Sequence, residues 1–390
     1  MNILIIEDMA SSTFGGAERT LRSYCEHLAT HHHLHLVYDR GGDYSRDLAH
    51  IYATVTRISV HPLRAQPLRS WLREIYKLMH LCKRQKIDLI LTHVVHSVLM
   101  LRVVRMFTGI RVVVLFKWVC STERVGLQAE WGLKGVDRGI SVSHFVAGYW
   151  TRNGFPPNRM CVIPEGVAVD LGGSGAECRR LSRVNGNINV GFAGRIVPEK
   201  GLHVLIDAIA LLRKQGIGAE CFVAGTFEPG DDNLLQSYHA SVQKQIDDLD
   251  MKSTVHFVGY INPLSDFIKR RDVMVLPSLC QDAQPIVVME SMAAGTPVVA
   301  TRVGGVPEML TGALARWICR PGDVMDLCTK LAEFLALTDA EKAQLACVLR
   351  DHVVTNYSIQ TWHQRMSKAI GLQCRGTLED NKKKEDSHAG

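Results

Sequence analysis

LPSLCQDAQPIVVMESMAAGTPVVATRVGGVPE (276–308) is the stretch that decides the fold of this chain. An apolar strand, Val273–Leu276, leads into a loop that carries Asp282, and a helix starts at Pro285. Proline suits the first turn of a helix because its missing N–H would have no intrahelical partner there. A second apolar strand, Val298–Thr301, follows the helix. Strand, helix and strand in this order predict a parallel α/β unit.

The helix start in this stretch has the chemistry of an anion site. Pro285 is followed by Ile286 and Val287, whose backbone N–H groups open the helix and attract negatively charged oxygens. Asp282 precedes the helix start and Glu290 lies within the helix, so the two acids can bind hydroxyls on either side of a bound phosphate. A sugar nucleotide has this layout of sugar, diphosphate and ribose.

The composition indicates a globular protein of two domains. The chain has 390 residues, of which 46% are apolar and 22% are charged. Its eleven cysteines are odd in number and form no CxxC pair, which favours a reducing cytoplasm. The first strand, Asn2–Ile6, directly follows Met1, so we expect no signal peptide. No apolar run reaches the roughly 18 residues that span a bilayer.

Basic residues are concentrated in the first half of the chain. Residues 1–180 hold 23 Lys and Arg against 15 Asp and Glu, whereas residues 181–390 hold 22 against 24. A predicted helix, Leu68–Lys86, has one basic face, formed by Arg69, Arg73, Lys77, Lys83, Arg84 and Lys86. The face is either an ordinary solvated surface or a contact for an anionic partner. Such a partner would be a charged acceptor or the inner face of the cytoplasmic membrane.

Both halves of the chain alternate short apolar strands with helices, which predicts two doubly wound parallel sheets. In the first half, Gly15 and Gly16 stand between strand and helix, where glycine lets the backbone approach a ligand. We expect a first domain over 1–170, a linker over 171–187 and a second domain over 188–357. A terminal helix over 358–372 and a disordered polar tail over 376–390 follow.

Two cations flank the first helix start of the second half. Gly194 and Arg195 follow the strand Asn189–Ala193, and Lys200 stands just before the helix that begins at Leu202. Arginine can bind two phosphate oxygens at once and lysine acts as a point charge, so the pair suits a diphosphate. The alternative is that both are partners in surface ion pairs.

Several of these motifs resemble the group 1 glycosyltransferases, the large retaining family numbered four. The resemblance rests on GFAGRIVPEKG (191–201), LPSLCQDAQPIVVMESMAAGTPVVAT (276–301) and GGVPE (304–308). CVIPEGVAVD (161–170) and FGGAERTLRSYCEHLA (14–29) are similar to the hinge approach and first loop of that family. The resemblance implies the GT-B fold, in which two Rossmann-like domains face each other across a cleft. The terminal helix would cross back to the first domain.

The resemblance also implies a reaction and a set of residues. A sugar would move from a UDP- or GDP-linked donor to an acceptor hydroxyl on a glycan, lipid or small molecule, with retention and without a metal or other cofactor. Arg195 and Lys200 would neutralise the diphosphate, Glu290 would bind the ribose and Asp282 the sugar. The remaining donor contacts would come from Gly15, Gly16, Gly194, Gly259, Tyr260, Pro285, Ile286 and Val287.

The chain departs from the family pattern at three places. Asp282 stands where glutamate is usual, and Ala283-Gln284 replaces a commoner Gly-Phe pair. Lys117 stands where many members carry a histidine near the reacting carbon, so that role falls to Lys117, His93 or His96. Two other functions stay open: a non-hydrolysing nucleotide-sugar epimerase, and a non-catalytic subunit that binds a nucleotide sugar.

Overall fold

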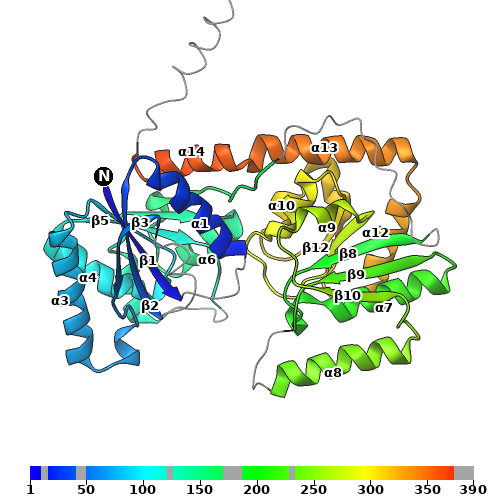
Figure 1. Cartoon of the computed structure of the whole chain (residues 1–390), viewed down its shortest axis with the longest axis horizontal. Helices are drawn as coiled ribbons and strands as arrows, with labels where there is room; N and C mark the ends of the chain where they lie inside the picture. The colour runs from blue at the N-terminus through cyan, green and yellow to red at the C-terminus, as the bar shows by residue number, and fades with distance from the viewer. Residues whose placement is uncertain (10–15, 41–49, 121–125, 170–186, 228–232, 373–390) are drawn as a thin grey trace, which may run out of the picture. The chain divides into compact units, whose positions relative to one another are not determined.

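The computed structural model describes residues 1–9, 16–40, 50–120, 126–169, 187–227 and 233–372 (Figure 1). The chain forms two compact units, each with its own parallel sheet. Unit 1 comprises Met1–Glu165 and Gln360–Gly390, and unit 2 comprises Gly166–Ile359. Gly15, the expected linker up to residue 186 and the expected tail lie outside the described residues.

Seven parallel strands form the sheet of unit 1, in the order β3-β2-β1-β4-β5-β6-β7. Their bounds are β1 Asn2–Met9, β2 His33–Arg40, β3 Tyr52–Arg57, β4 Leu89–Thr92, β5 Arg111–Phe116, β6 Arg138–Ser141 and β7 Met160–Val162. The central strands are buried along their length, as the apolar runs predict for a sheet covered on both faces. Helices α1 Gly16–Ala29, α3 Leu68–Arg84, α4 Val98–Thr108, α5 Leu127–Leu133 and α6 His144–Arg152 connect them.

Six parallel strands form the sheet of unit 2, in the order β10-β9-β8-β11-β12-β13. They are β8 Ile188–Ala193, β9 Ala219–Ala224, β10 Val255–Gly259, β11 Val273–Leu276, β12 Val298–Thr301 and β13 Ile318–Cys319. The helices are α7 Leu202–Lys214, α8 Asn233–Asp248, α9 Ser265–Lys269, α10 Ile286–Ala293, α11 Val306–Met309, α12 Val324–Leu335 and α13 Asp339–Tyr357.

The sheet of unit 2 has a hydrophobic core on each face. Along β11, Val273 and Val275 belong to the core under α7 and α12, and Met274 and Leu276 belong to the core under α10 and α13. Successive side chains of a strand point to opposite faces, so a continuous apolar strand fills both cores. Figure 1 shows α7 and α10 on opposite sides of this sheet.

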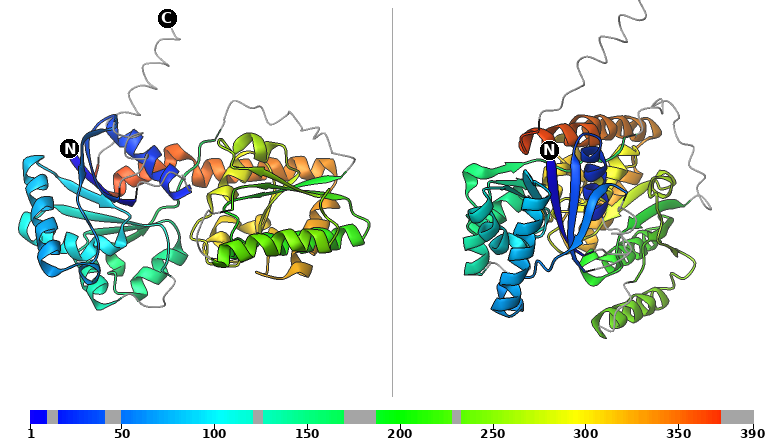
Figure 2. Two further views of the ribbon diagram at one scale, coloured as in Figure 1. Left: turned by 60° about the horizontal axis from the view of Figure 1, so that its bottom comes forward. Right: turned by 60° about the vertical axis from the view of Figure 1, so that its left-hand side comes forward.

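The last helix, α14 (Ile359–Ala369), packs in unit 1 beside α1 (Figure 2). The rings of Tyr24 and Trp362 lie 5.5 Å apart, and those of His27 and His363 stack at 4.4 Å. Helix α13 begins with a capping box between Thr338 and Glu341 and packs on α10 in unit 2. The change of unit therefore falls at the start of α14, between residues 359 and 360.

Three elements escaped sequence-based prediction. The edge strand β3 alternates buried and exposed residues and contains Thr54, Val55 and Thr56, a β-branched run that could have revealed it. Strand β13 has two residues and helix α5 has seven, too few for a clear periodicity. No helix among the described residues is both long and apolar enough to cross a bilayer.

Candidate functional site

The loops at the carboxyl edge of the unit 2 sheet carry most of the predicted site. In the sheet, β8 is flanked by β9 on one side and by β11 on the other. Strand β10 lies beyond β9, and β12 and β13 lie beyond β11. The strand order therefore reverses between β8 and β11, which is where open α/β sheets bind ligands. The loop after β8 holds Gly194, Arg195 and Lys200, and the loop after β11 holds Asp282.

Lys200 and Asp282 are in direct contact at this point. The Lys200 Nζ donates to Asp282 Oδ1 at 2.6 Å, and both side chains are partly buried. The hydroxyl of Ser278 donates to Asp282 Oδ2 at 2.6 Å, so both carboxylate oxygens are bonded. The cation predicted for the diphosphate and the acid predicted for the sugar, 82 residues apart, thus form one cluster.

Tight backbone packing fixes the loop that carries Asp282. The N–H of Gly305 donates to the Asp282 carbonyl at 2.8 Å, and the N–H of Gly304 donates to Gln281 Oε1 at 2.7 Å. Gly304 has φ +50°, and a Cβ there would lie 1.8 Å from the Asp282 carbonyl oxygen. On the other side, a Cβ on Gly201 would lie 2.0 Å from the Pro277 carbonyl oxygen. Only glycine fits either position.

Helix α10 starts one residue later than the sequence predicts. Pro285 is its N-cap, with φ −68° and ψ 112°, and Ile286 is the first helical residue. Proline at the cap still leaves the N–H groups of the first turn without intrahelical acceptors. Ile286 and Val287 are partly buried at this end, and Glu290 is partly buried one turn further on. The structure therefore has one acid, Asp282, before α10 and another, Glu290, within it.

The remaining predicted donor residues of unit 2 lie on the same sheet edge. Gly194 and Arg195 are exposed directly after β8, and Tyr260 is exposed directly after β10. Gly259 ends β10 with φ +75°, and its carbonyl accepts from the N–H of Gly225 at 2.8 Å. The structure thus places these residues along one edge, with Lys200 and Asp282 as the pair in contact.

In unit 1, Lys117 lies in a buried polar cluster rather than at an exposed strand end. Its Nζ is 2.6 Å from Glu165 Oε1 and donates to the Thr20 hydroxyl at 2.8 Å. The Thr20 hydroxyl in turn donates to Glu165 at 2.7 Å. The lysine charge is therefore balanced inside unit 1, which the sequence alone did not indicate. Gly16 is the first residue of α1, the helix that carries Thr20.

His93 and His96 follow β4, next to the strand-order reversal between β1 and β4. Burial, together with the charges of Lys117 and His96, lowers the pKa of His93 to about 3. His93 is therefore neutral at physiological pH, so a role near the reacting carbon would be that of an uncharged imidazole. Its ring lies edge-on to Trp118, with centroids 5.4 Å apart.

His96 belongs to a second group that sequence reasoning missed. Its ring stacks on His61 at 6.0 Å, and His61 Nε2 lies 2.8 Å from the buried carboxylate of Asp39. Asp39 is in β2, and His61 follows β3. The position of these residues in the sequence could have revealed the group, because each lies at or after the end of a parallel strand. Polar residues at the ends of parallel strands meet along one edge of the sheet. Among the described residues, no three His, Cys, Asp or Glu side chains are grouped to hold a metal ion.

Comparison with family models gives two matches that together cover most of the chain. Residues 179–345 match the model described as glycosyl transferases group 1. Residues 14–171 match the model described as glycosyltransferase family 4. The two matched segments hold the Arg195–Lys200 and Asp282–Glu290 motifs and the His93–Lys117 region, respectively.

Curated relatives match over part of their length. A putative colanic acid biosynthesis glycosyltransferase, WcaL of Salmonella typhimurium, is 22% identical over 59% of this chain and 55% of its own. A D-inositol 3-phosphate glycosyltransferase of Stackebrandtia nassauensis is 30% identical over 55% of this chain and 48% of its own. The chain thus spans about half the length of the curated relatives it matches.

Solved structures match nearly the whole chain. Anabaena Alr3699/HepE in complex with UDP has a TM-score of 0.79 at 21% identity, covering 95% of this chain and 99% of that one. A glycosyltransferase from Rickettsia africae has a TM-score of 0.80 at 17% identity, covering 95% and 97%. These likenesses show the fold: GT-B, with two Rossmann-like parallel-sheet domains.

Proposed function

Because this chain belongs to the group 1 glycosyltransferases, we propose that it transfers a sugar from a nucleoside diphosphate sugar to an acceptor hydroxyl. The observation that carries this proposal is the contact of Lys200 with Asp282, beside the start of α10. A lysine ammonium has three N–H donors. It can keep Asp282 as one partner and bind a phosphate oxygen as another.

The chemistry needs stabilisation of the leaving diphosphate. Glycosyl transfer develops positive charge on the sugar ring and negative charge on the departing phosphate. Lys200, Arg195 and the first-turn N–H groups of α10 are donors set in place before the reaction, and such preorganisation lowers the barrier. Asp282 would hold sugar hydroxyls and Glu290 the ribose. We propose departure and attack on one face of the sugar, which retains the anomeric configuration without a covalent intermediate.

The relatives support a proposal for the donor and acceptor classes. Structures similar to this chain include Alr3699/HepE with UDP-glucose, which favours a UDP sugar here. Curated relatives include a colanic acid biosynthesis enzyme and a lipopolysaccharide N-acetylglucosaminetransferase. We therefore propose a cell-surface glycan or glycolipid as the acceptor. The excess of basic residues in 1–180 supports a cytoplasmic enzyme that works at an anionic membrane surface.

The function is tested by removing the two cations singly. We expect Arg195→Ala and Lys200→Ala each to lower kcat about 10²- to 10³-fold, because each removes a donor to the leaving group. Release of UDP is measured over a panel of UDP and GDP sugars with glycan and lipid acceptors. Lys214→Ala, which removes an exposed cation at the end of α7, is the control and should keep full activity. Normal turnover in both site variants would refute the diphosphate assignment.

The retaining stereochemistry, the absence of a metal and the alternative epimerase activity are each tested by a separate measurement. NMR of the first product should show the anomeric configuration of the donor, and inversion would overturn the retaining mechanism. A chelator should leave the rate unchanged if no metal takes part. Incubation with donor alone separates this enzyme from an epimerase, because an epimerase would isomerise the sugar in the absence of any acceptor.

A further inference from the structure

The carboxyl edge of the unit 1 sheet carries a row of polar and aromatic side chains that the proposed handling of the donor does not use. We call it the strand-end row, and its members are Trp118 after β5, His93 and His96 after β4, His61 after β3, and Asp39 near the end of β2. The row crosses the strand-order reversal between β1 and β4. Open α/β sheets bind ligands outside such strand ends, so the row is a candidate binding surface.

Neighbouring members of the row lie against one another. The rings of Trp118 and His93 meet edge to face, with their centroids 5.4 Å apart. The rings of His96 and His61 are stacked at 6.0 Å, and His61 Nε2 lies 2.8 Å from Asp39 Oδ2. His96 is close enough to His93 for its charge to act on that ring. Residues from four strand ends thus form one continuous group.

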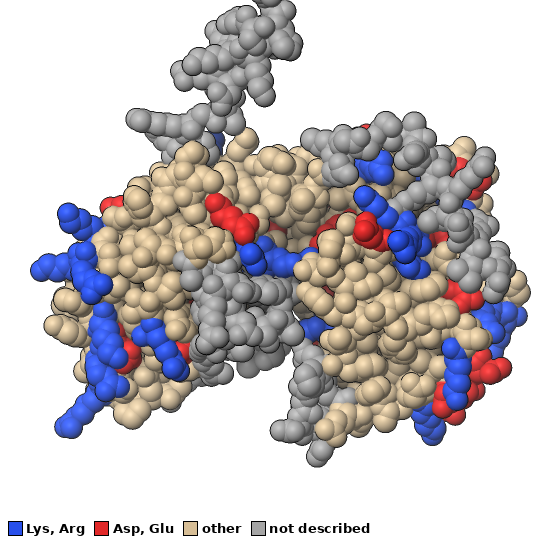
Figure 3. Space-filling model, in the orientation of Figure 1, with Lys and Arg blue, Asp and Glu red and all other residues tan. Residues whose placement is uncertain are grey.

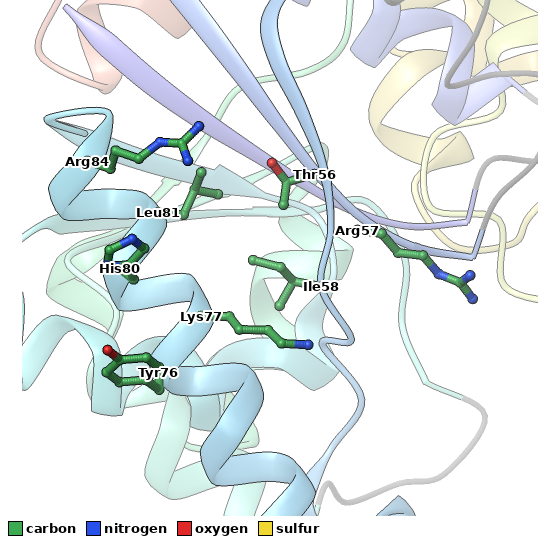
Figure 4. Close-up of a pocket in the computed structure, with 8 residues that line it drawn as sticks. All are labelled: Thr56, Arg57, Ile58, Tyr76, Lys77, His80, Leu81 and Arg84. Atoms are coloured by element: carbon green, nitrogen blue, oxygen red, sulfur yellow. The ribbon is translucent and has the colours of Figure 1, made fainter.

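The end of β3 takes part in the row and not in the basic face of α3. Figure 3 shows a column of Lys and Arg along the margin where α3 lies in Figure 1. Figure 4 shows the basic pocket of ≈ 360 Å³ that α3 forms with β3, and Arg57, at the end of β3, points away from the helix. The Arg57 Nε donates to the Asp39 carbonyl at 2.8 Å. This bond ties the end of β3 to that of β2.

The Asp39–His61 pair keeps one ring nitrogen for a ligand. The Asp39 side chain is 8% exposed, whereas that of His61 is 31% exposed. A carboxylate next to one imidazole nitrogen orients the ring and its other nitrogen. Asp39 occupies Nε2, and His61 Nδ1 makes no hydrogen bond with any residue that the structure describes. Such a nitrogen can form a hydrogen bond with a hydroxyl.

Trp118 presents its indole ring to solvent from a fixed position. The residue is 40% exposed, and its carbonyl accepts from the indole N–H of the fully buried Trp150 at 2.9 Å. The indole N–H of Trp118 itself has no hydrogen-bond acceptor within the described part of the chain. The ring therefore offers an apolar π face and one donor.

His93 also has a nitrogen that the protein leaves without a hydrogen bond. Its Nδ1 is buried, and no described residue bonds it. Buried nitrogens normally have a hydrogen-bond partner. A ligand hydroxyl or a water is the group that would complete this one.

These features suit the two chemistries of a sugar ring. A pyranose has C–H faces that pack on an aromatic ring and a rim of hydroxyls that bond to carboxylates and imidazoles. A hydrocarbon chain would leave the nitrogens of His61 and His93 without partners, which costs free energy. An inorganic ion would leave the ring of Trp118 uncovered. The row therefore favours a saccharide over a lipid chain or a simple ion.

We propose that the strand-end row binds the sugar of a saccharide acceptor. The sugar packs a C–H face on Trp118 and bonds its hydroxyls to His93 and His61, and Asp39 positions the His61 ring. This inference rests on the proposed function and gives its acceptor a chemical class. A free glycan and a glycolipid present the same ring, so the experiment has an arm for each.

The test is saturation-transfer NMR of the full chain with UDP and the methyl glycosides of glucose, galactose, mannose and N-acetylglucosamine. We expect saturable binding of at least one glycoside, with the strongest transfer to its ring C–H protons. Trp118→Ala should weaken this binding about tenfold, since an aromatic contact contributes on the order of one tenfold factor. Trp118→Phe keeps a ring and should lose less. The control is Trp131→Ala, which removes an indole of similar exposure, 43%, from α5.

The Asp39–His61 pair has its own readout. His61→Ala should weaken glycoside binding while leaving the affinity for UDP unchanged. Asp39→Asn should act through His61, so the double variant should lose no more than His61→Ala alone. Additive losses would contradict the positioning role of Asp39. Circular dichroism confirms that each variant is folded.

Octyl glycosides distinguish the two sources of the sugar. Equal affinity for the methyl and octyl forms assigns a free glycan, and tighter binding of the octyl form assigns a glycolipid; either supports the site. The inference is overturned if no glycoside binds, if octanol binds as well as octyl glycosides, or if Trp118→Ala and Trp131→Ala lose equally. Donor hydrolysis is measured in parallel: if it persists while glycoside binding fails, this inference falls and the proposed function stands.

Discussion

At the residue scale, two lysine–carboxylate pairs have the same N–O distance but differ in whether burial lets them bind a ligand. Lys117–Glu165 and Lys200–Asp282 are both 2.6 Å long. The side chains of the first pair are 3% and 6% exposed, and those of the second are 19% and 16% exposed. A partly exposed pair can exchange one partner for a ligand, whereas a fully buried pair must keep its own because an isolated buried charge is costly.

The buried pair gives a stability prediction. Lys117→Met leaves Glu165 without its cation, so we expect the free energy of unfolding to fall by about 3–5 kcal/mol. The double variant Lys117→Met/Glu165→Leu removes both charges and should recover much of that loss. Urea denaturation of the three proteins measures the difference. A single variant as stable as the parent would show that the pair is not needed for folding.

At the element scale, glycines at the carboxyl edge of unit 2 hold two loops against each other. Gly304 in the turn after β12 touches the backbone of Asp282, and Gly201 at the start of α7 touches that of Pro277. Both contacts place the loop after β11, and therefore the carboxylate of Asp282, at a fixed distance from Lys200. The geometry of the proposed donor site thus depends on residues that have no side chain.

Gly304→Ala should lower donor affinity and turnover. The new Cβ would lie 1.8 Å from the Asp282 carbonyl oxygen, so the loop that carries Asp282 must move. Gly216→Ala is a matched control, because Gly216 also has a positive φ, +81°, but has no atom within 4 Å of its Cβ position. Both variants bear the backbone strain of about 1–2 kcal/mol. Calorimetry with UDP and a turnover assay should distinguish them; equal loss of activity would contradict the role of Gly304.

At the scale of the whole molecule, the chain leaves unit 1 at residue 166 and returns to it at residue 360. Helix α14 is attached there by aromatic contacts to α1, among them the stacked rings of His27 and His363. Burial lowers the pKa of both histidines, that of His363 to about 4. The charge of His31 also lowers the pKa of His27, and the charge of His27 lowers the pKa of His363. The attachment therefore requires neutral imidazole rings.

This arrangement predicts a pH dependence of stability. The unfolded chain binds a proton at His363 near pH 6.5, but the folded chain binds it only near pH 4. Stability from this residue is therefore complete above pH 6.5 and is lost as the pH falls toward 4. His363→Phe keeps an aromatic ring that takes no proton, so its unfolding free energy should fall less steeply over that range. Parallel curves for variant and parent would contradict the prediction.

The sequence alone determined the alternation of elements and the ends of most of them. Helix α3 begins at the predicted Leu68 and ends at Arg84, two residues before the predicted Lys86, and α7 begins at the predicted Leu202. These features are local, because a buried strand or an amphipathic helix is encoded within a dozen neighbouring residues. The motifs around Arg195, Lys200, Asp282 and Glu290 were visible for the same reason.

Only the tertiary structure decided which distant residues meet. The order of the strands brings Lys200 to Asp282, the core of unit 1 encloses Lys117 with Glu165 and Thr20, and β3 closes a basic pocket against α3. The physical reason is that such contacts depend on sheet order and side-chain packing. Neither is encoded in the spacing of residues along one segment.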